Sequence, residues 1–200
     1  MNHPTAAWKE SQFKDIITKV ANIELYYKAI QFYLDFKPLL LNDMLMVLTP
    51  RLDHTRAVNF FIKVQQISLV KPYLRSVQKN NNKAINEALN NLLIEEEDYQ
   101  GLQASIDGYE NFDNIMLAQR LEKHELIEFR RIAAYLYKGN NRWKQSVDLC
   151  KKDKLFKVIW EDWSNLCLLC RCKWNNIYFD VWSFITVDGA GYISGCHVLC

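Results

Sequence analysis

The sequence predicts an all-α protein, an α-solenoid built from stacked antiparallel helix pairs. Apolar residues recur with the period of an amphipathic helix from residue 9 to about residue 154, and turn-forming residues separate these stretches. The start of each stretch and the start of the next but one are roughly 30 residues apart, which is the spacing of stacked helix pairs. A helical bundle is the alternative, but bundles prefer helices longer than these segments of about 10 to 14 residues.

The first two helices follow from the spacing of apolar residues. In the first, apolar side chains at i, i+3, i+4 and i+7 run from Phe13 to Val20 and share one face. The second has the same pattern between Ile23 and Leu34. It is expected to end before Pro38, because proline disfavours a helical residue ahead of it and can itself open the next helix.

Eight further helices are expected along the chain. They cover residues 38–48, 54–64, 69–78, 83–93, 96–106, 114–123, 126–138 and 142–152. Pro72 falls in the first turn of its helix, where the missing N–H costs little. Residues 80–82 are three asparagines that predict a polar turn, and Gly139 stands where a left-handed residue is expected to close a helix.

Composition and charge exclude several classes of protein. Half of the 200 residues are hydrophobic, which is enough for a sizeable core, and a net charge of +2 gives no electropositive field typical of a nucleic-acid binder. No run approaches the roughly 18 apolar residues of a spanning helix, and the first residues lack the pattern of a secretory signal. We therefore expect a cytoplasmic protein with no nucleic acid as partner and no direct membrane insertion.

Charged residues are segregated along the chain. Between Arg51 and Lys83 there are seven basic residues and one acid, whereas residues 86–113 carry eight acids and no lysine or arginine. Bands of opposite charge could set the register of neighbouring rods, or bind an acidic helix along a basic ridge. The alternative is that they are ordinary solvated helix faces, since isolated surface charges contribute little.

Catalytic motifs are weak. His54 and His124 lie in no recognisable nucleophile motif, so both are interpreted as surface histidines at helix ends. The six glycines form no phosphate-binding loop. We predict no enzyme activity, no catalytic residues and no cofactor.

Cysteines crowd the C-terminal part. All six lie between Cys150 and Cys200, so they do not form a disulfide framework for the whole fold. A C-x₂-C pair and a later Cys/His group leave a structural zinc site as an alternative hypothesis. The residues concerned are Cys167, Cys170, Cys172, Cys196, His197 and Cys200. Their spacing matches no common zinc motif, so no metal site is predicted.

Long stretches of the sequence resemble the clathrin heavy chain family. The resemblance covers about residues 2–157 and includes LYYKAIQFYLDFKPLLLND, RLDHTRAVNFF, LVKPYLRSVQ and LEKHELIEFRRIAAYL. It corresponds to the proximal leg of a heavy chain and implies a clathrin heavy chain repeat, an α-α superhelix. It also implies a structural role in vesicle coats, in endocytosis and intracellular protein transport, at the cytoplasmic face of coated vesicles and coated pits.

The resemblance also implies partners. In this family the heavy chain legs pack against one another, and the proximal leg binds clathrin light chains through a long acid-rich helix. Lys37, Lys71 and Arg75 are the residues we expect to contact that helix. A generic helical-repeat adaptor in membrane trafficking is the alternative, but small residues at fixed helix positions, its signature, are not found.

The resemblance divides the chain into two parts. Residues 1–157 are expected to form the α-solenoid, with the last repeat truncated. Residues 158–200 are expected to be a divergent tail, rich in cysteine and tryptophan, that is poorly ordered or the product of an incomplete gene model. The trimerisation segment of the family is expected to be absent from this chain.

Overall fold

The computed structural model describes residues 10–20 and 22–153, and the chain divides into two compact units, Met1–Phe112 and Asp113–Cys200. Every regular element in the described residues is a helix, and the helices pack in pairs, which confirms the predicted α-solenoid. None of the helices in these described ranges is long and apolar enough to cross a bilayer. The predicted tail, residues 158–200, lies outside the described residues.

In its described residues, the first unit contains seven α-helices with short 3₁₀ segments between several of them. The α-helices are α1 (Glu10–Lys19), α2 (Ile23–Phe36), α3 (Leu41–Leu48), α4 (His54–Lys63), α5 (Lys71–Val77), α6 (Lys83–Glu95) and α7 (Tyr99–Gly108). The 3₁₀ segments are η1 (Pro38–Leu40), η2 (Thr49–Arg51), η3 (Ile67–Val70) and η4 (Gln78–Asn80). The predicted helices 38–48 and 69–78 are therefore present, but each begins with a 3₁₀ turn.

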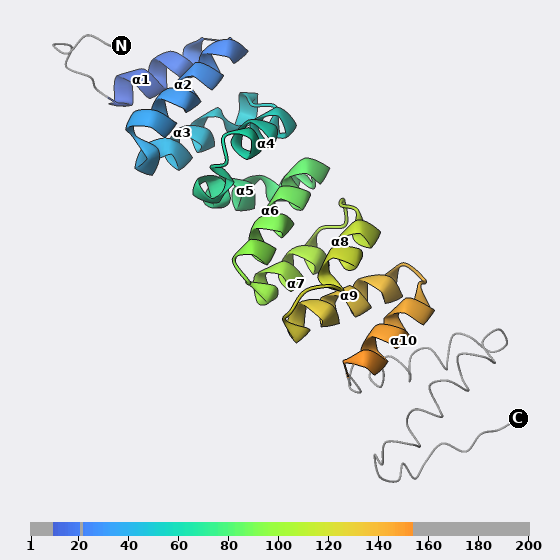
Figure 1. Ribbon diagram of the computed structural model, residues 1–200. Helices are drawn as coiled ribbons and strands as arrows, with labels where there is room; N and C mark the ends of the chain where they lie inside the picture. The colour runs from blue at the N-terminus through green and yellow to red at the C-terminus, as the bar shows by residue number, and fades with distance from the viewer. Residues whose placement is uncertain (1–9, 21, 154–200) are drawn as a thin grey trace, which may run out of the picture. The chain divides into compact units, whose positions relative to one another are not determined.

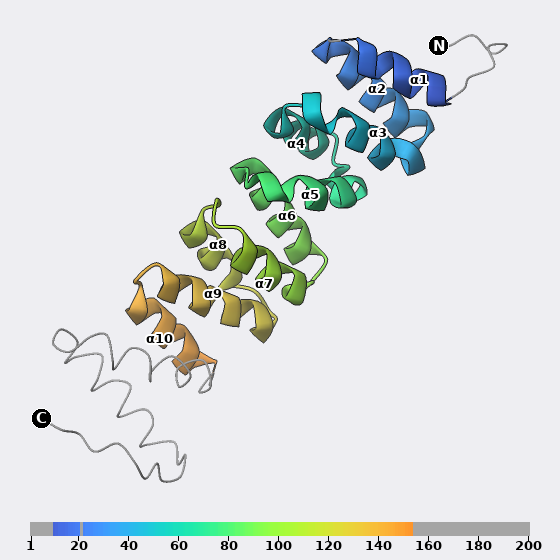
Figure 2. The ribbon, with the colours of Figure 1, turned by 180° about the vertical axis from the view of Figure 1, so that it is seen from behind.

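Successive helices of the first unit pack so that each central helix contacts its neighbours on both sides. Helix α3 packs against α1, α2 and α5, and α6 packs against α4, α5 and α7 (Figures 1 and 2). Their inward faces bury large side chains completely, among them Tyr33, Leu41, Phe61, Tyr73 and Ile85. These apolar stripes recur at helical spacing, so burial of one face explains each helix.

Asparagine and aspartate residues begin several of these helices. Asn22, Asp53 and Asn82 precede α2, α4 and α6, and each side-chain oxygen accepts hydrogen bonds from backbone N–H groups of the first turn. Those N–H groups have no partner inside the helix, so such caps contribute about 1 kcal/mol each. The predicted polar turn at residues 80–82 is present, with Asn81 in the left-handed conformation.

Left-handed residues other than glycine close two further turns of this unit. Gln65 has a φ of 55° after α4, and Glu97 has a φ of 56° after α6. In each turn the next residue donates its N–H to a carbonyl five residues back, from Gln66 to Phe61 at 3.0 Å and from Asp98 to Leu93 at 2.9 Å. These bonds satisfy carbonyl groups at the helix C-terminus.

The second unit contains α8 (Asn114–Leu121), α9 (Ile127–Gly139) and α10 (Trp143–Lys152) in its described part. Helix α9 packs against both others. The prediction that Gly139 is the left-handed closing residue is wrong, because α9 continues through it and Asn141 adopts that conformation, with a φ of 59°. Asparagine tolerates this region because its short side chain hydrogen-bonds locally.

A partly buried arginine links helices in the described part of this unit. Arg130 of α9 donates from Nε to Oδ2 of Asp153 at 2.6 Å, just beyond α10. It also donates from Nη1 to the carbonyl oxygens of His124 and Glu125, at 2.7 and 2.6 Å. One guanidinium thus ties the α8–α9 turn to the end of α10.

The environment of Tyr137 makes the stability of this unit depend on alkaline pH. Its buried hydroxyl donates to Glu122 at 2.7 Å, and burial, followed by that hydrogen bond, raises the pKa of Tyr137 to about 12. In an unfolded chain the pKa of tyrosine is about 10, so the folded state holds the proton more tightly. The stability due to this group is complete below pH of about 10, and is lost as the pH rises from there through about 12.

We therefore expect Tyr137→Phe to make the free energy of unfolding less sensitive to alkaline pH. The measurement is urea unfolding at pH of about 8 and about 11, with Tyr135→Phe as control, since Tyr135 is 45% exposed. At the lower pH Tyr137→Phe should cost about 1 kcal/mol for the lost hydrogen bond. An identical alkaline loss in both variants would contradict this account.

Candidate functional site

Two of the residues expected to bind a partner, Lys71 and Arg75, lie on one face of α5. They are four residues apart, and this spacing places side chains next to each other on a helix. Both are already paired with acids. Lys71 forms an ion pair with Glu96, and Nη2 of Arg75 lies 3.7 Å from Oδ2 of Asp98.

The acids that meet α5 lie in the turn between α6 and α7. The predicted helix 96–106 begins three residues later than expected, at Tyr99, because Glu97 is left-handed and Asp98 is the N-cap of α7. Oδ1 of Asp98 accepts from the N–H of Gly101 at 2.8 Å. A turn that breaks the run of four acids, residues 95–98, thus directs two of them toward the cations of α5.

The third expected residue, Lys37, lies in another part of the same unit. It follows the last turn of α2, is exposed, and donates its N–H to the carbonyl of Tyr33 at 2.8 Å. Further along the chain, Asn42 of α3 donates to the carbonyl of Leu69 at 2.8 Å, just before α5. The structure brings Lys71 and Arg75 together on α5, whereas Lys37 lies at the end of α2.

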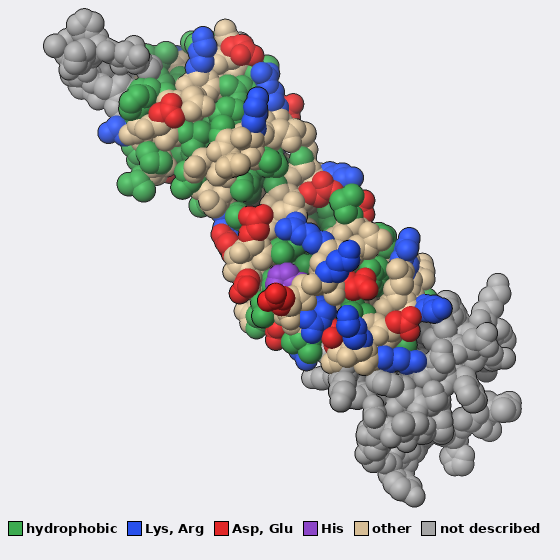
Figure 3. Space-filling model, in the orientation of Figure 1, with side chains coloured by type: hydrophobic (Ala, Val, Ile, Leu, Met, Phe, Trp, Pro, Cys, Tyr) green, Lys and Arg blue, Asp and Glu red, His purple; other side chains and the backbone are tan. Residues whose placement is uncertain are grey.

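Oppositely charged stretches of the sequence meet inside the first unit. Besides the two pairs on α5, Arg56 pairs with Glu24 at 3.1 Å and Lys83 with Glu87 at 3.7 Å. Figure 3 shows blue and red side chains interspersed over part of the face it presents. Part of the charge segregated along the chain is therefore neutralised in the fold. The sequence could not show this, because the partners are up to 32 residues apart.

Hydrophobic side chains gather over the N-terminal helices (Figure 3). A groove of about 190 Å³ between α1 and α2 is lined mainly by Phe13, Ile16, Ile17, Val20, Leu25 and Phe32. Ile16 is 59% exposed in it, whereas Phe13 is buried. The lining is suited to an apolar side chain and offers no catalytic group.

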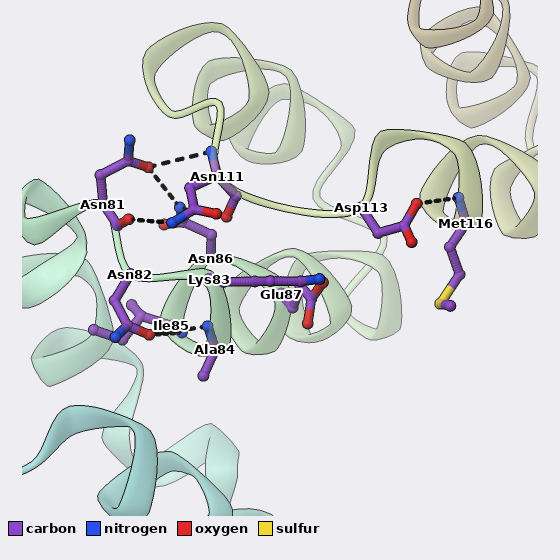
Figure 4. Close-up of polar contacts among 10 residues, drawn as sticks. All are labelled: Asn81, Asn82, Lys83, Ala84, Ile85, Asn86, Glu87, Asn111, Asp113 and Met116. Atoms are coloured by element: carbon purple, nitrogen blue, oxygen red, sulfur yellow. Dashed lines mark hydrogen bonds and ion pairs between the residues drawn. The ribbon is translucent and has the colours of Figure 1, made fainter. Parts of the chain in front are cut away.

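Three asparagines tie the start of α6 to the loop that follows α7. Asn86 donates to the side-chain oxygen of Asn81 at 2.8 Å and to the carbonyl of Asn111 at 3.0 Å, and Asn111 donates to the carbonyl of Asn81 at 2.9 Å (Figure 4). An open hollow of about 550 Å³ lies beside them. The sequence predicted only a polar turn here, since Asn111 is 30 residues from Asn81. These hydrogen bonds hold the loop after α7 against the start of α6.

His54 and His124, the two histidines in the described residues, each have a hydrogen-bond partner within the fold. Nδ1 of His54 lies 2.8 Å from the hydroxyl of Tyr73, and Nε2 lies 3.1 Å from the amide nitrogen of Asn80. His124 accepts from the N–H of Leu126 at 3.2 Å. The sequence interpretation placed both at helix ends on the surface: His54 is the first residue of α4, whereas His124 lies in the turn between α8 and α9, and each is half-buried.

Metal-ligating residues do not cluster within residues 10–20 and 22–153, where no group of three His, Cys, Asp or Glu side chains could hold an ion. Cys150 is buried in α10. The other cysteines, and with them the alternative zinc pattern, lie outside the described residues.

Short helices packed in consecutive pairs define an α-helical repeat protein. The particular family is shown by comparison with known proteins. Residues 45–165 match the clathrin family model described as "Region in Clathrin and VPS", and the chain belongs to this family.

Curated relatives agree with this assignment. The chain is 81% identical over 157 residues to the clathrin heavy chain of Drosophila melanogaster, and 75% identical over 157 residues to clathrin heavy chain 2 of Homo sapiens. It is 61% identical over the same length to the clathrin heavy chain of Dictyostelium discoideum. Each match covers 78% of this chain but only 9%, 10% and 9% of those proteins, respectively. The chain thus spans about a tenth of the length of the relatives it matches.

Proposed function

We propose that this chain is a structural segment of the clathrin coat, a piece of a heavy chain leg that serves endocytosis and vesicle-mediated protein transport at the cytoplasmic face of coated vesicles and coated pits. The observation that carries the proposal is the 81% identity over 157 residues to a clathrin heavy chain. The helical-repeat fold supports it, because such a fold offers extended surfaces for packing. The role needs no cofactor and no catalytic residue.

The finer part of the proposal concerns partners. The segment packs against other heavy chain legs and binds a clathrin light chain through an acid-rich helix. Lys71 and Arg75 are adjacent on α5 and 54% of the Arg75 side chain is exposed, so carboxylates of a docked helix could reach them. Lys37 is an additional contact that a long helix would meet further along the same unit.

Neutralising the two cations of α5 tests this proposal. We expect Lys71→Gln/Arg75→Gln to weaken binding of a recombinant clathrin light chain by about tenfold, because each lost charge removes a favourable contact. Affinity is measured by fluorescence anisotropy of the labelled light chain at about 0.05 M and about 0.5 M NaCl, and the difference should shrink at high salt. Circular dichroism checks that the variant is folded.

A matched control removes two cations elsewhere. Lys123→Gln/Arg131→Gln changes the net charge equally and affects exposed side chains of the second unit, so affinity should stay within about twofold. Equal binding by the wild type and the α5 variant would show that Lys71 and Arg75 are not the contacts. No binding by the wild type at either salt concentration would show that this chain does not bind light chain.

A further inference from the structure

The environment of Lys71 and Arg75 is negative, although both residues are cations. The turn between α6 and α7 places Glu96 and Asp98 beside α5, and their neighbours in the chain, Glu95 and Glu97, are exposed acids. Two carboxylates therefore pair with the two cations, and two more acids lie next to them in the sequence. An acidic partner that approaches this part of α5 meets a surface with an excess of its own charge.

The two carboxylates that touch α5 belong to residues in or beside a tight turn, and that of Asp98 is also held by the N–H of Gly101. Glu96 ends α6, the left-handed Glu97 reverses the chain, and Asp98 caps α7 through Oδ1 while Oδ2 faces Arg75. Because the turn fixes the backbone of Glu96 and Asp98, and the cap fixes the Asp98 side chain, pairing with Lys71 and Arg75 costs less ordering than pairing with a separate chain. A partner helix has to compete with acids that are already in place.

The pairs are nevertheless weak enough to be exchanged. The side chains of Lys71 and Glu96 are 24% and 38% exposed, and those of Arg75 and Asp98 are 54% and 37% exposed. Ion pairs with this degree of exposure are screened by water and salt and contribute little. A carboxylate from a partner can therefore replace the internal one.

We infer that Glu96 and Asp98 form an internal competitor: they occupy the cations of α5 in the free chain and must be displaced when an acid-rich helix binds. This inference rests on the proposed light-chain contact at Lys71 and Arg75. It adds that the α6–α7 turn lowers the affinity for acidic partners. It also restricts binding to partners whose carboxylates can replace both internal ones, one helical turn apart.

The test removes the internal charges while keeping the fold. Glu96→Gln/Asp98→Asn is made in the full chain, and asparagine at position 98 can still accept from the N–H of Gly101, since it is a good N-cap. At about 0.05 M NaCl we expect the variant to bind the labelled light chain about three to ten times more tightly than the wild type. The gain should fall toward zero at about 0.5 M NaCl.

Two controls separate competition from a general effect of charge. Asp107→Asn/Glu110→Gln raises the net charge equally on exposed acids of the same unit, and should change affinity less than about twofold. Adding Lys71→Gln/Arg75→Gln to Glu96→Gln/Asp98→Asn should abolish the gain, because the acids act through those cations.

Each outcome decides between the two proposals. Unchanged or weaker binding by Glu96→Gln/Asp98→Asn, while the wild type binds, would overturn the competitor and leave the light-chain contact standing. An equal gain in the charge control, or a gain that survives loss of Lys71 and Arg75, would also overturn it. If neither the wild type nor the variant binds, the competitor and the light-chain contact both fail.

Discussion

Arg130→Ala is expected to lower the free energy of unfolding of the second unit by about 3–5 kcal/mol, because it leaves a buried charge without its partner. The side chain of Asp153 is only 7% exposed and that of Arg130 is 19% exposed. The substitution also leaves the carbonyl groups of His124 and Glu125 without their donor. Urea unfolding followed by circular dichroism measures the loss.

The neighbouring Arg131→Ala is the control, since Arg131 is exposed on the same helix and should change stability by less than about 0.5 kcal/mol. Arg130→Lys should recover only part of the loss. Lysine keeps the charge but lacks the planar group that donates to a carboxylate and two carbonyls at once. Similar stability of Arg130→Ala and Arg131→Ala would mean that the guanidinium does not tie this unit together.

Leu41→Ala is expected to destabilise the first unit by about 2–5 kcal/mol, through lost apolar burial and the cavity left behind. Leu41 is the first residue of α3, the helix that packs against α1, α2 and α5, and it is completely buried. Chemical denaturation of the whole chain, with tryptophan fluorescence and circular dichroism compared, gives the loss.

Leu39 offers a control of the same residue type, two positions away. It lies in η1 and is 94% exposed, so Leu39→Ala should change stability by less than about 0.5 kcal/mol. Equal effects of the two substitutions would contradict the packing of α3. The pair also tests the proline-led start of this helix, because only the residue after the 3₁₀ turn faces inward.

Much of the helical architecture could be predicted from the sequence. The helix beginning at Ile23 was predicted because its apolar residues repeat at helical spacing, and Tyr26, Ile30 and Tyr33 of that stripe are indeed buried. Pro72 lies in the first turn of α5, as predicted. Apolar periodicity and proline act on neighbouring residues, so their effects can be predicted from a single sequence.

Details of the turns could not be predicted in the same way. The run of acids at residues 95–98 looked like the start of a helix, whereas Glu97 is left-handed and Asp98 caps α7. Gly139 carried the usual signal for a helix end, but Asn141 has that role, because the apolar stripe of α9 continues through Leu136 and Tyr137. Each conformation depends on which residues the following helix buries.

The candidate site was predictable only in part. The four-residue spacing of Lys71 and Arg75 was visible in the sequence, but their pairing with Glu96 and Asp98 was not, since Lys71 and Glu96 are 25 residues apart. The same holds for Arg130, whose carboxylate partner lies 23 residues away. Contacts of this kind follow from how helices stack, and no local pattern encodes them.

The turns closed by Gln65, Glu97 and Asn141 have a consequence for the rate of folding. Each is sealed by a bond between residues only five apart, and each helix then packs against close neighbours in the chain. Few native contacts therefore wait for a long loop to close. Proteins dominated by such local contacts fold on the order of microseconds to milliseconds, so each unit can assemble soon after its helices leave the ribosome.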